Sequence, residues 1–407
     1  MNLNEAKEKA ARCLECKEPK CVEGCPIHVN IPGFIKFVKE GNLEEAYKVI
    51  LEKNYFGSIC GRVCSHDIQC KGSCVQAEKG EPVDIGELEA FVSDWGLINS
   101  TMGKRDKSVL NKERVAVVGA GPAGLTCALR LERMGYAVTL FEKTSELGGI
   151  LQYGIPERRL PKDIVFDTVD AMTLARMEVE VGKTLGKDFT INELFKKGYK
   201  AIFLGIGCDM PRKLNIPGIE KKGVHYAKEF LKKIDHMKFE NVIVIGGGNV
   251  AMDVARTVKE RGAKTVNVLY RKSRVEMKAN QIEIVKAIES GINIVTNSVV
   301  TEILGTDVAS GVKCANGSTY RGETIVVAIG SIPDFTVLDD LKLTDRDLVS
   351  IDEYGETSKE FVFAGGDLTE LHPNVSRAVN SAIRAADGID RKMKIEKEKL
   401  QKLVEEN

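Results

Sequence analysis

The sequence predicts an α/β protein in which a helical, cysteine-rich segment precedes two βαβ units. Two observations carry this prediction. Eight of the eleven cysteines lie before residue 75, in a stretch with helical patterning. After it, a pattern of apolar strand, glycine turn, helix and second strand occurs twice, about 125 residues apart, which indicates a duplicated unit. A chain of 407 residues is long enough for two or three domains, each with its own core.

The composition excludes several classes of protein. The 59 basic and 59 acidic residues balance, so no global field attracts nucleic acid or anionic lipid. The first residues, MNLNEAKEKAARC, lack the apolar core of a signal peptide, and no stretch approaches the roughly 20 apolar residues of a membrane span. We therefore expect a cytoplasmic protein. Cytosolic thiols stay reduced, so these cysteines are expected to bind metal or lie buried rather than form disulfides.

The first boundaries follow from hydrophobic patterning and turn residues. Residues 1–107 form the helical segment, and its end overlaps a polar stretch, Met102–Asn111, that is typical of a linker. In the first βαβ unit we expect strands over 114–118 and 137–141, with a helix over 125–134 between them.

The second unit repeats this order of elements. We expect strands over 241–245 and 265–270, joined by a helix that ends at Arg261. The tail over 391–407 is strongly charged, and a solvated terminal helix is expected there.

The N-terminal cysteines fall into two closely spaced groups. The first is Cys13-x2-Cys16-x4-Cys21-x3-Cys25-Pro26, and the second is Cys60-x3-Cys64-x5-Cys70-x3-Cys74. Thiolates hold iron–sulfur cubanes, and in two-cluster proteins the cysteine before proline commonly ligates the other cluster, which here is Cys25. Structural zinc is the alternative, but zinc sites usually show paired C-x2-C knuckles, and only one C-x2-C occurs here. The spacing therefore favours iron–sulfur clusters.

The glycine turn of the first unit follows a strand and opens a helix. Its glycines allow a tight turn and close backbone approach, while the helix N-terminus offers free N–H groups to a pyrophosphate. Glu142, at the end of the next strand, can accept hydrogen bonds from a ribose 2′-hydroxyl and would repel a 2′-phosphate. We therefore expect the adenosine of FAD or NAD here. The candidate contacts are Gly119, Gly121, Pro122, Ala123, Gly124, Glu142, Lys143 and Gly149.

The second unit differs in the charge at its strand end. That strand leads into YRKSR, whose basic side chains would neutralise a 2′-phosphate. The charge at this position usually determines whether a site binds NADPH or NADH. The site is therefore expected to bind NADPH rather than NADH, and the alternative is a merely solvated turn. Its candidate contacts are Gly246, Gly247, Gly248, Asn249, Val250, Arg271, Lys272 and Arg274.

A third segment, FVFAGGD, supports flavin at the first site. It is an apolar strand that ends at Gly366 and Asp367, and a helix is expected from about Asn374. An aspartate there can bond a ribityl hydroxyl, and a helix N-terminus can point toward the pyrophosphate or the ring. The alternative is an aspartate that only caps the helix.

With these motifs in place, the chain resembles the small subunit of NADPH-dependent glutamate synthase and its relatives. Those relatives include the large subunit of the ferredoxin-dependent NADPH transhydrogenase and the electron-entry half of dihydropyrimidine dehydrogenase. The resemblance runs from about Cys13 to Ala386. It rests on the segments CLECKEPKCVEGCP, ICGRVC, GEPVDIGELEAF, GAGPAG, ELGGILQYGIPERRLP, GGGNVAMD, YRKSR and FVFAGGD.

The resemblance implies two interleaved Rossmann-like domains for FAD and NADPH, as in glutathione reductase, preceded by an α-helical domain with two [4Fe–4S] clusters. The FAD domain is then discontinuous. The expected domains are 1–107 for the clusters, 108–210 and 331–390 for FAD, 211–330 for NADPH and 391–407 for the charged tail.

The resemblance also implies a set of metal ligands. One cluster would be held by Cys13, Cys16, Cys21 and Cys74, and the other by Cys25, Cys64 and Cys70. The fourth ligand of the second cluster in such relatives is an oxygen-bearing side chain of the GELEAF-like segment, here Glu89. Cys60 is then a buried thiol that binds no metal, whereas simple counting would assign four cysteines to each cluster.

These features together predict an NADPH-dependent iron–sulfur flavoprotein oxidoreductase. NADPH delivers two electrons as hydride whereas a cluster accepts one, so a flavin is expected between them. No substrate domain is visible, which favours an electron-input subunit of a hetero-oligomer that feeds a catalytic partner. A self-contained NADPH:ferredoxin or NADPH:acceptor oxidoreductase is the alternative, and a zinc scaffold with nucleotides as sensors is a third. The sequence names no side chain essential to the hydride step.

Overall fold

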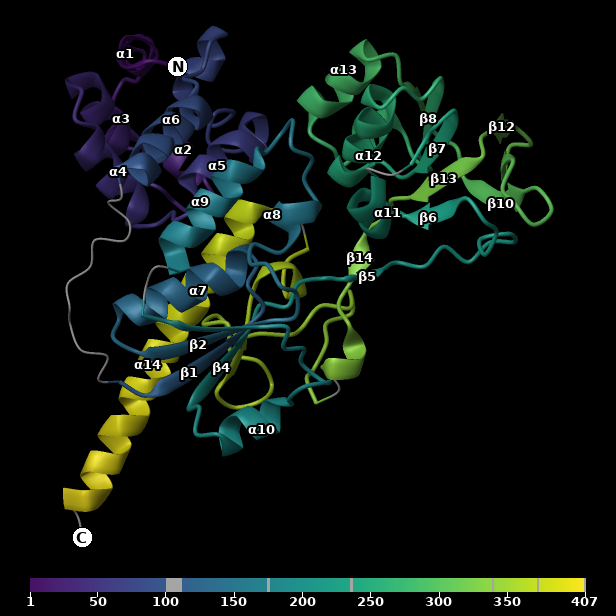
Figure 1. Cartoon of the computed structure of the whole chain (residues 1–407). Coiled ribbons are helices and arrows are strands. Elements are labelled where there is room, and N and C mark those ends of the chain that lie inside the picture. The colour runs from purple at the N-terminus through teal and green to yellow at the C-terminus, as the bar shows by residue number, and fades with distance from the viewer. Residues whose placement is uncertain (100–111, 174–175, 235–236, 339, 372, 406–407) are drawn as a thin grey trace. The chain divides into compact units, whose positions relative to one another are not determined.

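The computed structural model describes residues 1–99, 112–173, 176–234, 237–338, 340–371 and 373–405, drawn as ribbon in Figure 1. The expected linker, Met102–Asn111, lies outside these residues. The chain divides into two compact units that alternate along the sequence. Unit 1 consists of Met1–Gln152, Glu157–Cys208 and Pro333–Asn407, and unit 2 of Tyr153–Pro156 and Asp209–Ile332.

The N-terminal part of unit 1 is built from short helices. They are α1 (Leu3–Ala11), α2 (Lys20–Glu23), α3 (Ile31–Glu40), α4 (Leu43–Leu51), α5 (Gly57–Val63) and α6 (Ile85–Ile98), with 3₁₀ turns at His66–Ile68 and Val75–Lys79. Asn30 caps α3 and Asn42 caps α4, each accepting a backbone N–H of the first turn. Between them Gly41, with φ of 83°, ends α3 in the left-handed conformation.

Close helix contacts hold this helical part together and join it to the rest of unit 1. A Cβ at Gly96 of α6 would stand 2.3 Å from the ring of Tyr47, so only glycine lets α6 approach α4 this closely. Helices α5 and α6 also pack against α9 (Lys162–Thr173). The Arg133 guanidinium at the end of α7 (Pro122–Arg133) lies over the Tyr55 ring, 4.8 Å from its centroid.

The rest of unit 1 is an α/β domain around a five-stranded parallel sheet in the order β15-β4-β1-β2-β3. The strands are β1 (Arg114–Val118), β2 (Ala137–Glu142), β3 (Glu178–Val181), β4 (Ala201–Leu204) and β15 (Val362–Ala364). Its helices also include α10 (Ile191–Lys196) and α14 (Val375–Glu405), while α8 (Ile150–Tyr153) lies where the chain leaves unit 1. The sheet therefore gains its fifth strand from a distant part of the sequence.

Helix α14 packs along α7 and then continues beyond the sheet (Figure 1). Its buried side includes Ala382, Ile389 and Met393, so the apolar periodicity passes through position 390 without a break. The expected tail helix is therefore the last part of α14. Past Met393 the apolar side chains face solvent, and Leu400 and Val404 are 57% and 77% exposed.

Unit 2 contains a second five-stranded parallel sheet, in the order β6-β13-β7-β8-β9. Its strands are β6 (Val224–Tyr226), β7 (Asn241–Ile245), β8 (Thr265–Leu269), β9 (Asn293–Val295) and β13 (Thr324–Val327). Helices α11 (Ala227–Lys233), α12 (Asn249–Glu260) and α13 (Gln281–Glu289) belong to this unit, whose core includes Phe230, Met252 and Val268.

Two small antiparallel sheets complete unit 2. One has the order β10-β11-β12, from Val300–Leu304, Gly311–Cys314 and Thr319–Arg321. The other pairs β5 (Met210–Pro211) with β14 (Ser331–Ile332), at the two ends of the unit's long segment. The two parallel sheets with their helices confirm the predicted α/β class with two Rossmann-like domains.

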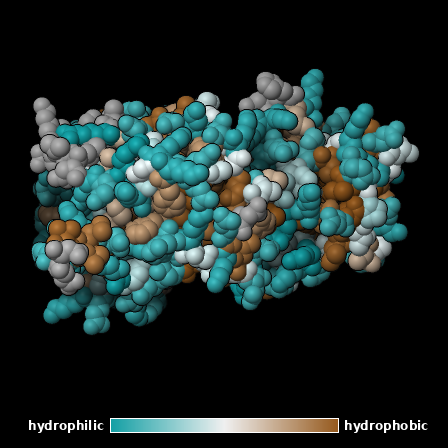
Figure 2. All heavy atoms as spheres, turned by 90° about the horizontal axis from the view of Figure 1, so that it is seen from below, coloured by the Kyte–Doolittle hydropathy of each residue, from teal (hydrophilic) through white to brown (hydrophobic). Residues whose placement is uncertain are grey.

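The surface is largely hydrophilic on the face shown in Figure 2, where hydrophobic residues form separate patches. This agrees with a charged fraction of 29% and equal numbers of basic and acidic residues. In the described part of the chain, no helix combines the length and apolar character that a membrane crossing requires.

Candidate functional site: two nucleotide turns and two thiol groups

The first glycine turn joins β1 to α7, and its three glycines have different surroundings. Gly119 has φ of 98°, a conformation that favours glycine. A Cβ at Gly124 would stand 1.7 Å from the Gly119 carbonyl oxygen, so the helix packs directly on the turn. A Cβ at Gly121 would meet nothing within 4 Å, which leaves open space beside its backbone. These are the three roles of glycine in a dinucleotide-binding turn.

The N-terminus of α7 suits an anion. Pro122 and Ala123 open the helix, and Pro122 has no N–H that needs a partner. No described side chain caps this end, so the first N–H groups of the helix and its positive dipole end remain for a ligand. The turn therefore fits a pyrophosphate.

Glu142 is tied to the same turn. Its side chain is buried, Oε2 accepts the Ala120 N–H at 2.8 Å, and Oε1 accepts the N–H and the hydroxyl of Thr144, each at 2.9 Å. These bonds fix the carboxylate at the end of β2, beside the turn. The next residue, Lys143, is exposed.

Two further segments converge on the turn. The Gly148 N–H donates to the Ala120 carbonyl at 2.7 Å, and a Cβ at Gly149 would stand 3.1 Å from the Gly121 Cα. A Cβ at Gly366 would stand 2.9 Å from the Cβ of Ala123. The start of α7 is therefore lined by three glycines from separate parts of the sequence, and they form a cradle that added side chains would fill: Gly121, Gly149 and Gly366.

Asp367 follows Gly366 in a 3₁₀ turn at the end of β15. The Gly366 N–H donates to the Ser381 hydroxyl at 2.8 Å, which holds this turn against α14. The thiol of Cys208 donates to the Asp367 carbonyl oxygen at 3.2 Å. Both contacts position the predicted flavin-binding aspartate, and neither Ser381 nor Cys208 belongs to a motif that sequence reasoning could have used.

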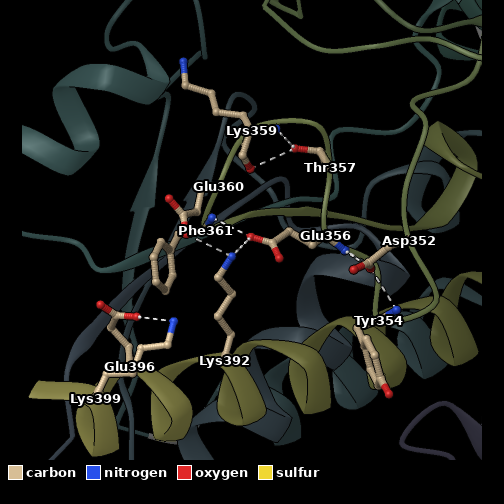
Figure 3. A network of polar contacts seen from close by, with 10 residues as sticks. All are labelled: Asp352, Tyr354, Glu356, Thr357, Lys359, Glu360, Phe361, Lys392, Glu396 and Lys399. Atoms are coloured by element: carbon tan, nitrogen blue, oxygen red, sulfur yellow. Dashed lines mark hydrogen bonds and ion pairs between the residues drawn. The ribbon is translucent and has the colours of Figure 1, made fainter. Parts of the chain in front are cut away.

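The other end of β15 is held by a polar network, shown in Figure 3. Lys392 of α14 bonds Glu356 at 2.6 Å, and the same carboxylate oxygen accepts the Phe361 N–H at 2.8 Å. Phe361 has φ of 59°, which is unusual for a bulky residue, and the Lys392 ammonium lies 4.7 Å from the centroid of its ring. The network therefore fixes where β15 begins, just as Ser381 fixes where it ends.

The second glycine turn joins β7 to α12 within unit 2. Gly246 has φ of 145°, and a Cβ there would stand 2.2 Å from the Ala328 carbonyl oxygen. A Cβ at Gly247 would meet the Tyr270 ring at 2.4 Å, whereas one at Gly248 would meet nothing within 4 Å. As in unit 1, one glycine closes the turn and another leaves its backbone open to a ligand.

The N-terminus of α12 and the residues that follow the C-terminal end of β8 complete this second site. Asn249 accepts the Asn280 N–H at 2.8 Å, and Val250 is 40% exposed. Lys272 pairs with Glu276 at 3.0 Å, and hydrogen bonds from Lys272 and then Ser273 lower the pKa of Glu276 to about 2. Arg271 and Arg274 are exposed and form no ion pair with described residues. These two guanidinium groups are therefore the cations left for an anionic ligand.

The first group of thiols combines Cys13, Cys16 and Cys21 with Cys74 from far along the chain. Burial, followed by repulsion from Cys74 and Cys13, raises the pKa of Cys21 to about 12. Burial also raises the pKa of Cys13, and the charge of Cys16 adds a smaller rise. Ionising these buried thiols costs free energy unless a metal offsets the negative charge, so these four sulfurs fit a metal centre.

The second group combines Cys25 with Cys64 and Cys70. Burial raises the pKa of Cys25 to about 11, and the next causes include Glu89 and Cys64. Burial also raises the pKa of Cys70, reinforced by Glu89, Cys25 and Cys64 in that order. The structure thus brings Cys25 together with Cys64 and Cys70, which lie far along the chain.

Glu89 of α6 is the fourth member of this second group. It is 7% exposed, and burial raises its pKa to about 7 although a hydrogen bond from Asn54 lowers it. Cys60, also buried, lies against Cys64 and Glu89. Among the described residues no three His, Cys, Asp or Glu side chains converge on the position of a single metal ion. The four ligands of a cubane bind four different irons, so a cubane does not require them to converge on one point.

Comparison with protein-family models places both parts of the chain. Residues 1–101 match the family described as dihydropyrimidine dehydrogenase domain II, 4Fe-4S cluster. Residues 113–386 match the family described as pyridine nucleotide-disulphide oxidoreductase. The first match covers the helical part with both thiol groups, and the second covers both glycine turns.

Comparison with known proteins gives similar relatives along nearly the whole chain. The glutamate synthase [NADPH] small chain of Escherichia coli K12 is 30% identical over 95% of this chain and 91% of its own length. The NAD-dependent dihydropyrimidine dehydrogenase subunit PreT of E. coli O157:H7 is 30% identical over 94% and 93%. FprA of Mycobacterium tuberculosis, solved with NADPH, shares the fold with a TM-score of 0.63, at 16% identity over 71% of this chain and 86% of that one. The chain therefore belongs to the glutamate synthase small chain family of NAD(P)H-dependent iron–sulfur flavoprotein oxidoreductases.

Proposed function

We propose that this chain passes electrons from NADPH, by way of FAD and two [4Fe–4S] clusters, to a partner protein. The observation that carries the proposal is the content of unit 1, which holds both the three-glycine cradle and the two thiol groups. Bound flavin supplies the conversion of a hydride into single electrons. The protein supplies the positions of the groups and the charges around them.

The residues of the cradle bind and orient the flavin nucleotide. The open backbone at Gly121 admits the pyrophosphate, Gly149 lets the next segment lie close beside Gly121, and the start of α7 donates N–H groups to the ligand. Glu142, fixed by Ala120 and Thr144, accepts from the ribose hydroxyls, and Asp367 is placed for the ribityl chain. This division of roles explains why a buried carboxylate lies next to the proposed phosphate site.

The residues of unit 2 select NADPH over NADH. Arg271 and Arg274 bind the 2′-phosphate, because they carry charge that no described carboxylate neutralises. Lys272 contributes less, since Glu276 already holds it. The relatives carry both kinds of name, NADPH for the glutamate synthase small chain and NAD for PreT, so the proposal for this chain rests on these side chains and not on the names.

The thiol groups bind the clusters, with Cys13, Cys16, Cys21 and Cys74 on one and Cys25, Cys64, Cys70 and Glu89 on the other. The pKa values of Cys21, Cys25 and Cys70 are raised by burial, so binding of iron is what makes thiolates stable there. The names "small chain" and "subunit" of the relatives support a hetero-oligomer in which a partner subunit receives the electrons.

Anaerobic purification followed by iron, sulfide and flavin analysis tests this function. We expect about eight irons and one FAD per chain, four irons for each cubane, and loss of flavin colour at far lower NADPH than NADH. A colourless protein that contains zinc would contradict the cluster proposal, and equal response to both nucleotides would contradict the role of Arg271 and Arg274. Mass spectrometry of proteins that co-purify anaerobically then identifies the partner.

A further inference from the structure

The carboxylate of Glu276 holds both of the residues that separate Arg271 from Arg274. Its Oε1 pairs with the Lys272 ammonium at 3.0 Å. Its Oε2 accepts the hydroxyl of Ser273 at 2.8 Å and the backbone N–H of the same residue at 3.2 Å. One side chain therefore fixes the middle of the segment whose two arginines are expected to meet the 2′-phosphate.

The backbone closes the same turn in the opposite direction. The Glu276 N–H donates to the Ser273 carbonyl at 3.1 Å, and the Met277 N–H donates to the Arg274 carbonyl at 3.1 Å. Ser273 and Glu276 form a capping box at the start of a 3₁₀ turn over Arg274–Glu276. Such a reciprocal pair fixes the residue at which a helical turn begins.

Tyr270 connects Glu276 to the glycine turn of the same unit. Its hydroxyl donates to the Glu276 carbonyl at 2.8 Å, and its ring lies 2.4 Å from where a Cβ at Gly247 would stand. The Ala279 N–H also donates to the Gly247 carbonyl, at 3.1 Å. The conformation of the YRKSR turn and its position beside the glycine turn therefore both depend on contacts made by Glu276.

The negative charge of Glu276 would by itself oppose a 2′-phosphate, since a carboxylate near this position usually favours NADH. The side chain stays ionised, because hydrogen bonds from Lys272 and then Ser273 lower its pKa to about 2. Glu276 is exposed, and an exposed ion pair contributes little to folding stability. The main consequence of these contacts is therefore local, in the conformation of the turn.

We propose that Glu276 is a positioning residue that preforms the YRKSR turn, so that Arg271 and Arg274 meet the 2′-phosphate of NADPH. The inference rests on the proposed NADPH site and deepens it. A turn that takes its binding conformation for only part of the time weakens binding in proportion to that fraction. NADH has no 2′-phosphate, so its affinity does not depend on this turn. Glu276 thus favours NADPH in spite of its own charge.

The test is equilibrium binding of NADP⁺, NAD⁺ and 2′,5′-ADP to the purified holoprotein, measured by calorimetry. Glu276→Ala removes the contacts with Lys272 and Ser273, so NADP⁺ and 2′,5′-ADP should bind about tenfold more weakly while NAD⁺ binds as in the native protein. Glu276→Gln keeps an oxygen that accepts from Ser273 and loses the negative charge, so NADP⁺ should bind at least as tightly as it does to the native protein.

The matched control is Glu240→Ala. It breaks another exposed 3.0 Å ion pair of unit 2, the one with Lys264, and should leave all three affinities unchanged. A loss of NADP⁺ affinity in this control equal to that in Glu276→Ala would assign the effect to surface charge in general and overturn the proposal.

Three further results would overturn it. They are an NADP⁺ affinity in Glu276→Ala equal to or above the native one, an equal loss of NADP⁺ and NAD⁺ affinity in that variant, and a loss in Glu276→Gln as large as in Glu276→Ala. Arg271→Ala separates this inference from the site beneath it. If Arg271→Ala does not weaken NADP⁺ binding, the 2′-phosphate site and the inference both fail; if it does while Glu276→Ala does not, only the positioning by Glu276 fails.

Discussion

The carboxylate of Glu142 accepts the backbone N–H of Ala120 at 2.8 Å, and this bond links the end of β2 to the glycine turn that follows β1. The two residues are brought together by parallel pairing of the strands, in which Val118 lies opposite Phe141. Because the carboxylate is buried, its removal leaves the Ala120 N–H without an acceptor, which costs about 1–3 kcal/mol.

Glu142→Ala is therefore expected to lower both thermal stability and flavin retention. Gel filtration followed by flavin analysis should show a protein depleted of FAD, while Glu180→Ala, at an exposed position of β3, should retain it. Full flavin content in Glu142→Ala would show that the carboxylate does not hold the adenosine ribose.

Replacing Arg271 or Arg274, the two exposed arginines of YRKSR, should change nucleotide preference. Arg271→Ala and Arg274→Ala each remove a charge-assisted hydrogen bond worth about 1.5–3 kcal/mol, so the KM for NADPH should rise roughly tenfold to a hundredfold while that for NADH stays nearly constant. Lys264→Ala, at the opposite end of β8, serves as the control for general charge. A parallel rise in both KM values would argue against a 2′-phosphate contact.

Gly248, whose backbone is open to a ligand, offers a test of NADPH binding that should leave the fold intact. A Cβ at Gly248 meets no atom within 4 Å, so Gly248→Ala should leave the melting temperature unchanged and weaken NADPH binding by about tenfold or more, ~1.4 kcal/mol. Gly124→Ala in unit 1 should instead lower the melting temperature, because the added Cβ would overlap the Gly119 carbonyl oxygen. Overpacking of that kind costs about 1–3 kcal/mol of folding stability. Normal NADPH affinity in Gly248→Ala would place the nucleotide elsewhere.

His225 should make the stability of unit 2 depend on pH near neutrality. Burial, and then the charge of Lys233, lowers the pKa of His225, with Glu229 opposing them. The unfolded chain therefore takes up a proton near pH 6.5, before the folded chain does, and stability falls as pH drops from there through the lower folded value. Melting curves at about pH 7.5 and about pH 5.5 should show a smaller difference in His225→Gln than in the native protein. An equal difference in both would assign the pH effect to other groups.

Much of the fold follows from local sequence, and the reasons are physical. The strands at Arg114–Val118 and Asn241–Ile245 and the glycine turns after them depend on short-range hydrophobic patterning and backbone conformation, and the structure has them where the sequence predicts. The edge position of β15 could not be predicted in the same way, because it depends on pairing with β4 from a distant segment. The expected tail helix is part of α14 because burial of Ile389 and Met393 continues across Asp390.

The thiol groups and their surroundings show where local reasoning ends. In the sequence the cysteines form two runs of four. In the folded chain Cys74 lies with Cys13 and Cys21 of the first run, and Cys25 lies with Cys64 of the second. Asn54, Ser381 and Cys208 belong to no motif, and each matters only through a contact made in three dimensions. The candidate ligand-binding residues could therefore be named from the sequence, whereas the residues that contact and position them could not.

Anaerobic titration of the purified protein with NADPH, followed by EPR, probes the electron path itself. We predict that NADPH alone generates the signals of two reduced [4Fe–4S] centres with different g values, together accounting for about two spins per chain when titrated to completion. A protein whose flavin is reduced by NADPH while no iron–sulfur signal develops, or develops only with a stronger chemical reductant, would contradict electron transfer from NADPH to the clusters.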